Sequence, residues 1–446
     1  MSSSTSGDGG PNADAPAART IEALARAGVS TARVIHCDLY GKCRSKDLPL
    51  DRLQHAVEGL GYCVISMVES IHGEPLDVQG FAGDSEFPDM HSRVDLATGR
   101  ALPWEPDVAW FLADLRDDRG LSPRAALDRA TAELGALGLT AAMAPELEFY
   151  LLERRDGAPV RYGPDTGLAY VNGRRVDPRG AFKRIYAGVR EFGLDVGTAH
   201  HEFSPGQFEI NLDHGGALAA ADRAFLFKEA VRELAAGEGL EANFMAKPFT
   251  DAEGSSYHVH VSLQRDDENA FATADGELAP DCLAFLAGVP EHADGLTALG
   301  APTVNSYRRL VPESMAPTRA DWGHDHRFAY VRVPRDRGAG TRLELRAPDA
   351  SANPYLIHCG ILVAGLDGLR RGLRPPAPRA PGAESEGRPL PLTLGRALDA
   401  LEADAVLVDG LGPELVRTFV ALKRSEVERE RRHVSDWDWA EYAFHS

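Results

Sequence analysis

The sequence predicts a protein of two domains that mixes helices and strands. A chain of 446 residues is longer than one small core requires, so two domains are the natural expectation. Segments with alternating apolar residues, typical of strands, follow segments with a helical period along most of the chain. We predict a tail over residues 1–18, a small domain over 19–116 and a larger domain over 117–446.

The first domain is expected to be a small mixed sheet with one helix, preceded by a disordered tail. Residues 1–18 are rich in Ser, Gly, Pro and Ala and have neither a basic start nor an apolar run, so no secretory signal is expected. The pattern that follows predicts a short helix over 20–27, strands over 32–39, 44–49 and 108–115, and a helix over 50–60.

The second domain begins with a helix that has Ser122 as its N-cap and Pro123 as its first residue. This helix leads into a strand that carries Glu146 and Glu148. The Pro-rich stretch 374–389 is expected to be an exposed loop. The periodicity predicts further helices over 179–192, 219–237, 393–401 and 412–433, and strands over 208–212, 257–263 and 343–345.

Charge and composition exclude several kinds of partner. The formal charge of −19 argues against nucleic acid and against an anionic membrane surface. No apolar run approaches the ~18 residues of a membrane-spanning helix. The five cysteines are scattered and lack zinc-ligand spacing, which favours reduced thiols in a cytoplasmic protein.

Glu146 and Glu148 lie two residues apart on a predicted strand, so their side chains share one face. Two carboxylates on an otherwise apolar strand repel each other and are costly to bury unpaired. The pair is either the solvated face of an edge strand or a pair of metal ligands. The other motifs decide between these explanations.

Three further motifs carry charged or metal-binding side chains. Glu202 and Glu209 flank a Pro-Gly turn that brings them together, although a hairpin with exposed acidic residues has the same pattern. His258 and His260 share a strand face, which alone is weak evidence for a metal. Arg342, Glu344 and Arg346 alternate with Leu, as in an anion site or an exposed salt-bridged face. More arginines gather at Arg309, Arg327 and Arg332.

Together these motifs predict a site for two metal ions and a polyphosphate. Five carboxylates with one imidazole and no thiolate favour Mg²⁺ or Mn²⁺, and six ligands are too many for one such ion that keeps water or substrate in its shell. The nearby arginines suit phosphate, and this combination is typical of phosphoryl transfer. The predicted metal ligands are Glu146, Glu148, Glu202, Glu209, His258 and Glu344.

In this order, the motifs resemble those of the glutamine synthetase family. Each is weak alone, but eight in one order are specific, and the match extends over nearly the whole chain after the tail. The matching segments are Pro-Glu-Leu-Glu-Phe (145–149), His-His-Glu-Phe-Ser-Pro-Gly-Gln-Phe-Glu-Ile (200–210), Phe-Met-Ala-Lys-Pro (244–248), His-Val-His-Val-Ser-Leu (258–263), Asn-Ser-Tyr-Arg-Arg-Leu-Val-Pro (305–312), Arg-Leu-Glu-Leu-Arg-Ala-Pro-Asp (342–349), Asn-Pro-Tyr-Leu (353–356) and Ala-Leu-Asp-Ala-Leu-Glu-Ala-Asp (397–404).

The resemblance implies an α+β fold with a β-grasp-like N-terminal domain and a catalytic domain whose curved antiparallel sheet is flanked by helices. It also implies a homo-dodecamer of two hexameric rings with active sites between subunits. ATP would phosphorylate the γ-carboxylate of glutamate, and an amine would then displace phosphate from γ-glutamyl phosphate.

The resemblance also assigns roles to individual residues. One ion would be held by Glu148, Glu202 and Glu209, and the other by Glu146, His258 and Glu344. The predicted ATP-binding residues are His260, Ser262, Arg327, Arg332 and Arg342. The predicted substrate-binding residues are Glu253, Gly254, Arg309 and Arg346, and the predicted catalytic residues are Arg309, Arg327 and Arg342.

Three positions depart from the family pattern around the second substrate. The N-terminal loop with an Asp that helps bind ammonium corresponds to 65–71, which has no Asp. The Glu that takes a proton from ammonium corresponds to Met315, and the Asn that contacts glutamate corresponds to Glu253. We therefore predict a ligase for an organic amine, similar to γ-glutamylpolyamine and γ-glutamylethanolamide synthetases, with Glu69 as a candidate amine-binding residue.

Three alternatives remain open at this point. The chain could be a true glutamine synthetase with a rebuilt ammonium site, or a catalytically silent homologue that forms rings. The acid substrate could also differ from glutamate, because Glu253 replaces the family's Asn.

Overall fold

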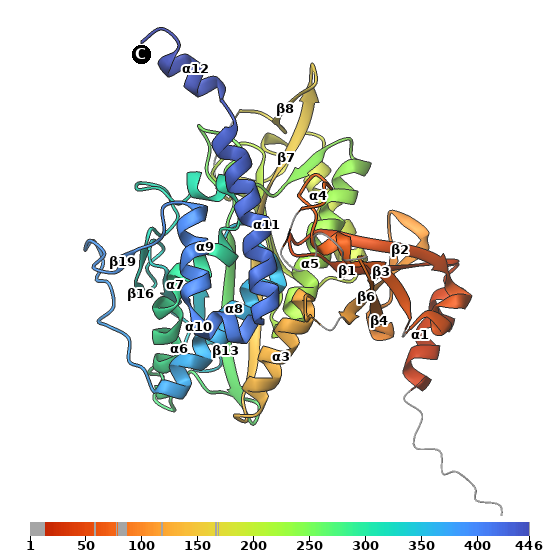
Figure 1. Ribbon diagram of the computed structural model, residues 1–446, viewed down its shortest axis with the longest axis horizontal. Helices are drawn as coiled ribbons and strands as arrows, with labels where there is room; N and C mark the ends of the chain where they lie inside the picture. Colours follow the sequence, from red (N-terminus) through yellow and green to blue (C-terminus); the bar gives the residue numbers. More distant parts are fainter. Residues whose placement is uncertain are drawn as a thin grey trace, which may run out of the picture.

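The computed structural model describes residues 14–57, 59–76, 78, 87–116, 119–165, 167 and 169–445. Two main sheets dominate this part of the chain, and Figure 1 shows strands β1 to β6 on one side of the molecule and helices α6 to α10 on the other. The mixture of helices with a largely antiparallel, curled sheet confirms the predicted α+β class.

The N-terminal helix α1 (Asp14–Arg26) begins earlier than expected. Residues 1–13 of the predicted tail lie outside the described residues, but the prediction is wrong for 14–18, which are helical. Ala has the highest helix propensity, and Pro is tolerated in the first helical turn because its missing N–H has no partner there. The Pro and Ala content of this stretch is therefore compatible with a helix start.

The first sheet has the strand order β2-β1-β6-β4-β3, with β5 paired to β6. It is mixed, as predicted, because β1 and β6 run parallel while the other pairs are antiparallel. The helix predicted over 50–60 is shorter, since a 3-10 turn (Leu50–Arg52) and α2 (Leu53–Ala56) are followed by a strand. The strands are β1 (Thr31–Cys37), β2 (Cys43–Pro49), β3 (Leu60–Cys63), β4 (Asp89–Val94), β5 (Arg100–Leu102) and β6 (Glu105–Arg116).

The second sheet has the central order β16-β17-β18-β13-β7-β10-β9. Its pairs are antiparallel except for β16 with β17, and β8, β11, β12 and β14 pair at its margins. Its strands are β7 (Thr140–Arg155), β8 (Ala158–Arg161), β9 (Val196–His201), β10 (Gln207–Leu212), β11 (Gly215–Gly216), β12 (Glu241–Asn243), β13 (Tyr257–Arg265), β14 (Glu268–Asn269), β16 (Trp322–His324), β17 (Val331–Val333) and β18 (Leu343–Leu345).

The helices of the second part bury apolar faces beside this sheet. α3 begins at Pro123, and the Ser122 side chain accepts a hydrogen bond from the Ala125 N–H, as predicted for its N-cap. The four other helices expected from periodicity are confirmed within a few residues as α4, α5, α9 and α11. The helices are α3 (Pro123–Gly135), α4 (Ala181–Glu191), α5 (Ala217–Gly237), α6 (Pro280–Glu291), α7 (Ala293–Gly300), α8 (Pro354–Arg371), α9 (Leu394–Ala403), α10 (Ala405–Leu411), α11 (Pro413–Arg432) and α12 (Asp436–Tyr442).

The Pro-rich stretch is mostly exposed, but its end is not a loop, because β19 (Arg388–Pro389) pairs with β15 (Arg319–Ala320). The domain division after residue 116 stays a prediction, and residues 117 and 118 lie outside the described residues. Among the described helices, none is long and apolar enough to span a membrane.

Candidate active site

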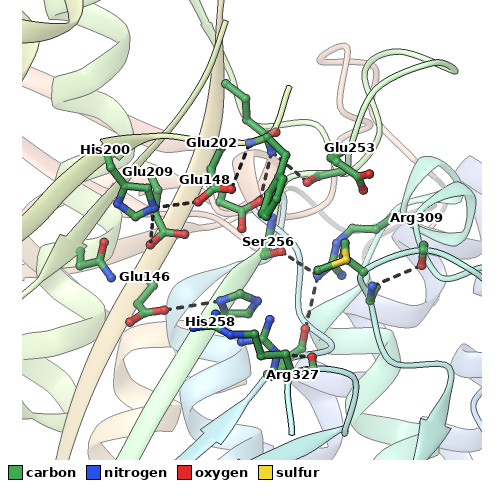
Figure 2. A pocket seen from close by; sticks show the side chains of 18 of the residues that line it. Glu146, Glu148, His200, Glu202, Glu209, Glu253, Ser256, His258, Arg309 and Arg327 are labelled. Carbon is green, nitrogen blue, oxygen red and sulfur yellow. Dashed lines mark hydrogen bonds and ion pairs between the residues drawn. The ribbon is translucent and has the colours of Figure 1, made fainter. Parts of the chain in front are cut away.

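The predicted metal ligands meet because neighbouring strands of the second sheet carry them in register. Glu148 on β7 pairs with Glu209 on β10, and Glu146 pairs with His258 on β13. On the next strand, Glu344 pairs with His260. Directly paired residues point to the same face of a sheet, so these side chains project into one space (Figure 2).

Glu202 joins this group through the turn between β9 and β10. The Glu202 N–H donates to the Gln207 carbonyl at 2.9 Å, and Gly206 adopts the positive φ of 71° that the turn needs. His200, which pairs with Glu209 across the hairpin, lies with its Nε2 2.7 Å from a Glu202 oxygen and 3.7 Å from a Glu209 oxygen. The predicted fold-back of the chain at the Pro-Gly turn is confirmed.

The carboxylates on the β10 side carry more negative charge than the nearby protein offsets. The Glu148 carboxylate accepts hydrogen bonds from the Ser256 N–H at 2.8 Å and the Gln207 side chain at 3.2 Å. Burial raises its pKa to about 7, and the Glu202 charge adds to the shift. Burial, followed by the Glu148 charge, also raises the pKa of Glu209 well above its usual range. A bound cation would offset this repulsion.

The groups on the β13 side have positive neighbours. His260 Nε2 lies 2.9 Å from one Glu146 oxygen, and His258 Nδ1 lies 3.5 Å from the other. Burial alone would raise the pKa of Glu146, but the His260 charge outweighs burial and holds this pKa well below its usual range. Burial likewise opposes the shift at Glu344, where Arg346 lowers the pKa to about 2.

His258 is suited to metal binding because it is held neutral. Burial lowers its pKa to about 4, and the Arg346 charge adds to the effect. A neutral imidazole leaves a nitrogen lone pair for a metal. Glu344, which is 1% exposed, also receives hydrogen bonds from Arg332 and Arg346.

Two adjoining hollows share Glu146. All six predicted metal ligands and the four predicted substrate-binding residues line a cavity of about 670 Å³, together with Arg327 and Arg332. The other predicted ATP-binding residues, His260, Ser262 and Arg342, line a second hollow of about 380 Å³. Arg342 Nε donates to His260 Nδ1 at 3.2 Å, which connects the second hollow to the acidic group.

The substrate-binding positions predicted from the sequence form one wall of the larger cavity. Gly254 is required there, because a Cβ at this position would lie 2.6 Å from the Ala246 carbonyl oxygen and 2.8 Å from Arg309. Arg309 is buried, and its guanidinium donates to the Ala347 carbonyl and to the Ser256 hydroxyl. Figure 2 shows Glu253 and Arg309 on the opposite side of the cavity from Glu146.

Arg327 and Met315 also line the larger cavity. Arg327 is exposed, and its guanidinium makes no ion pair with another residue among those the structure describes. It is therefore available to an anion. Met315 is 40% exposed, beside Ser314 and Ala316, so this part of the wall carries no charge.

The donor set fits divalent metal ions on the evidence of this structure. Three triads have their ligand atoms within 4.8 Å of one another: Glu146, Glu209 and His258; Glu146, His260 and Glu344; and His200, Glu202 and Glu209. Oxygen-rich triads with an imidazole suit Mg²⁺ or Mn²⁺. The raised pKa values of Glu148 and Glu209 independently indicate an unmet need for positive charge.

Sequence reasoning missed several residues of this site. His200, Gln207 and Asn211 line the cavity, but no role was assigned to them. The available signal for His200 was its position two residues before Glu202 in the segment 200–210. Glu69, the candidate amine-binding residue, does not line the cavity of its own chain, and its carboxylate pairs with Arg44 at 2.5 Å.

Comparisons with known proteins agree with these observations. The family model described as glutamine synthetase, catalytic domain, matches residues 120–442. A glutamine synthetase of Methanocaldococcus jannaschii is 36% identical over 386 residues, which cover 82% of this chain and 85% of that protein. A glutamine synthetase of Thermus thermophilus is 34% identical over 449 residues, which cover 95% and 98%.

Solved structures of similar fold cover almost the whole chain. A GmaS–ADP complex has a TM-score of 0.84 and 32% identity, and covers 95% of this chain and 99% of that chain. The cryoEM structure of Plasmodium falciparum glutamine synthetase has a TM-score of 0.83 at 20% identity, with coverage of 96% and 98%, and this likeness shows the fold alone.

Proposed function

The chain belongs to the glutamine synthetase family and is an ATP-dependent ligase of that family, and on this premise we propose that it joins the γ-carboxyl group of glutamate to an organic primary amine. The γ-carboxylate oxygen would take the terminal phosphoryl group of ATP and leave ADP. The amine nitrogen would then form the amide bond, losing a proton as phosphate leaves. Phosphorylation is needed because an unmodified carboxylate has no good leaving group.

We assign the acidic group to two divalent ions. Glu148, Glu202 and Glu209 would hold one ion, and Glu146, His258 and Glu344 the other. When bound, the ions would neutralise phosphate charge during transfer. The raised pKa of Glu148 supports this assignment, because burial and the Glu202 charge outweigh the opposing effects of Ser256 and Arg309, and a bound cation would offset this repulsion.

We assign the smaller hollow to the nucleotide. His260, Ser262 and Arg342 line it, and it meets the larger cavity at Glu146. Arg327 and Arg332 lie on the other side of this junction, where they would contact the phosphates and stabilise transition-state charge. We assign Arg309, Arg346 and Gly254, which line the larger cavity, to binding of the acid substrate.

The amine assignment depends on one observation, the uncharged cavity wall at Met315. A thioether offers no charge to hold ammonium, whereas it contacts methylene groups well. Tyr170 and Phe203 also line the cavity and are exposed. These side chains favour an amine with an organic body, such as a polyamine, ethanolamine or methylamine.

A panel of amines tests this proposal. With ATP, Mg²⁺ and saturating glutamate, at least one organic amine should give a kcat/KM for phosphate release about tenfold above that for ammonium. Met315→Glu should shift the preference toward ammonium, and Met315→Leu should not. Saturation by ammonium with no response to organic amines would indicate a true glutamine synthetase. Absence of turnover with every amine would indicate a silent homologue.

We also propose a homo-dodecamer of two hexameric rings. The helix α12 stands away from the rest of the chain (Figure 1), and Trp437, Trp439 and Phe444 in or beside it are exposed. Exposed aromatic groups of this kind are typical of protein interfaces. Light scattering should give twelve times the chain mass of 48.1 kDa, and a monomer would contradict the assembly. A cytoplasmic location stays a prediction.

A further inference from the structure

Resting on the proposed function, we propose that the Glu253 carboxylate binds an ammonium group of a substrate. Glu253 lines the larger cavity and is partly buried there. Its carboxylate has no hydrogen-bond or ion-pair partner within the part of the chain that the structure describes. The other glutamates of this cavity differ, because each has an imidazole, a guanidinium or an N–H group close to its carboxylate.

The backbone on both sides of Glu253 is held in place. The Tyr150 hydroxyl donates to the Glu253 carbonyl at 2.7 Å, and the Glu253 N–H donates to the Ser204 hydroxyl at 2.8 Å. The next carbonyl, that of Gly254, accepts from the Gln207 side chain at 3.0 Å. A carboxylate on a fixed backbone binds its partner with a smaller loss of entropy than one on a mobile loop.

Two cations that line this cavity, Arg309 and Lys247, donate their hydrogen bonds to groups other than the Glu253 carboxylate. Arg309 donates to the Ala347 carbonyl, the Ser256 hydroxyl and the Arg346 carbonyl, and the Lys247 ammonium donates to the Ala252 carbonyl. These hydrogen bonds leave the Arg309 charge near Glu253 without a contact between the two side chains. The Glu253 carboxylate therefore remains open to direct pairing with an ammonium group of a substrate. Opposite charges across a binding surface determine which partner fits.

An organic ammonium suits Glu253 better than a metal ion does. Figure 2 shows Glu253 on the Arg309 side, apart from Glu146 and His258. A single carboxylate supplies too few ligands for a divalent ion, but it pairs readily with one R–NH₃⁺ group. This group has two possible sources in the proposed reaction: the α-ammonium of glutamate, or an ammonium group of the acceptor amine.

Steady-state kinetics of Glu253→Gln separate the two sources. If the α-ammonium is bound, the KM for glutamate should rise at least about tenfold, and the preference for glutamate over glutarate, which lacks this group, should fall equally. If the acceptor is bound, its KM should rise instead. The kcat should change little in both cases, and Glu253→Asp should retain part of the effect.

Controls make the result decisive. Glu384→Gln removes the same charge from an exposed loop residue and should leave both KM values unchanged. Circular dichroism checks the fold of each variant, and calorimetric titration of glutamate against glutarate in the presence of ADP and Mg²⁺ measures binding without turnover. Unchanged KM values and unchanged binding in Glu253→Gln would overturn the inference. If only ammonium is an acceptor, the amine proposal fails while this test still applies.

Discussion

Arg124 and Glu148 are both buried charged side chains, but Arg124 forms ion pairs with carboxylates, whereas the Glu148 carboxylate accepts hydrogen bonds from an N–H group and a side-chain amide. Arg124 donates to Asp222 through Nε at 2.8 Å, to Asp114 through Nη1 at 2.8 Å, and more weakly to Asp95 at 3.5 Å. The Tyr355 hydroxyl donates to Asp222 at 2.8 Å. This cluster joins strand β6 of the first sheet to helices α3, α5 and α8 of the second part.

The carboxylates around Glu148 are close together without comparable pairing. Burial and like charges raise the pKa of Glu148 and of Glu209. At Arg124, burial alone would lower the pKa, but the bond to Asp222 outweighs burial and the pKa is raised. Charge that is paired internally holds elements together, and charge that is left unpaired in a cavity is available to a ligand. Mutation of Arg124 should therefore lower stability, whereas mutation of Glu148 should lower activity and leave the fold intact.

The largest expected effect is on stability and follows removal of Arg124. Arg124→Met leaves carboxylates buried without their cation, so the free energy of unfolding should fall by about 3–5 kcal/mol. Denaturant unfolding measures the change. Arg154→Met is the matched control, because its pair with Glu241 is exposed and should contribute little to stability. Equal losses in both variants would contradict a structural role for the Arg124 cluster.

Glu148→Ala should have the reverse profile. The variant should keep its fold and assembly, because removing one of several repelling carboxylates relieves strain, but kcat should fall on the order of 10²- to 10³-fold. Mn²⁺ titration measures the loss of metal binding, and phosphate release measures the loss of turnover. Glu153→Gln, farther along the same strand, is the control. Turnover unchanged in Glu148→Ala would count against the metal assignment.

Stabilisation by added metal should also distinguish the Arg124 cluster from the carboxylates around Glu148. Each Mg²⁺ ion at about 100 times its dissociation constant should stabilise the wild-type protein by about 2.7 kcal/mol, because it binds the folded state. The same gain should appear in Arg124→Met, whereas Glu148→Ala should lose the part that comes from the ion held by Glu148, Glu202 and Glu209. Thermal unfolding with Mg²⁺ and with EDTA measures it. An undiminished gain in Glu148→Ala would show that neither ion is held by Glu148.

The smallest effect concerns His292, a second internally paired group. Its ring nitrogens lie 2.7 Å from Asp404 and 3.0 Å from Asp367. Burial alone would lower the pKa of His292, but these two carboxylates outweigh burial and raise this pKa above its usual value. The stability it contributes is thus complete below pH 6.5 and is lost as pH rises through the higher folded-state pKa.

We expect a loss of roughly 1 kcal/mol in the free energy of unfolding on this rise, since the two carboxylates that pair with His292 are partly exposed. The difference in stability between wild type and His292→Gln, measured by urea unfolding across pH 5 to 9, should shrink toward high pH. Arg371, which pairs with Asp367 at 2.7 Å, is present in both proteins and does not titrate in this range. A constant difference across pH would contradict the charged imidazole.

Periodicity predicted the elements with strong amphipathic or alternating patterns. The strand of Glu146 and Glu148 is an example, whereas the helix starting at Pro123 was predicted from its Ser122 N-cap and the Pro at its first position. α8 was missed because it is apolar on nearly every side and so has no amphipathic period. The helix over 50–60 was overestimated, since tertiary pairing of β3 overrides local propensity.

The site was predictable as a set of residue types but not as a geometry. Alternation shows that Glu146 and Glu148 share a face, but only strand register shows that Glu209 and His258 lie beside them. The bond between His200 and Glu202 likewise depends on a turn whose shape a single sequence does not define. The unpaired state of Glu253 could not be predicted, because it depends on where every neighbouring cation is bound.

The register of the second sheet also has a consequence for synthesis of the chain. Glu146 and Glu344 are brought together only through β13, which lies between their strands. A nascent polypeptide that still lacks β18 therefore cannot complete the acidic pocket, however well its earlier strands have paired. Binding of the ion assigned to Glu146, His258 and Glu344 should be among the last events of maturation, after the ribosome has released this part of the chain.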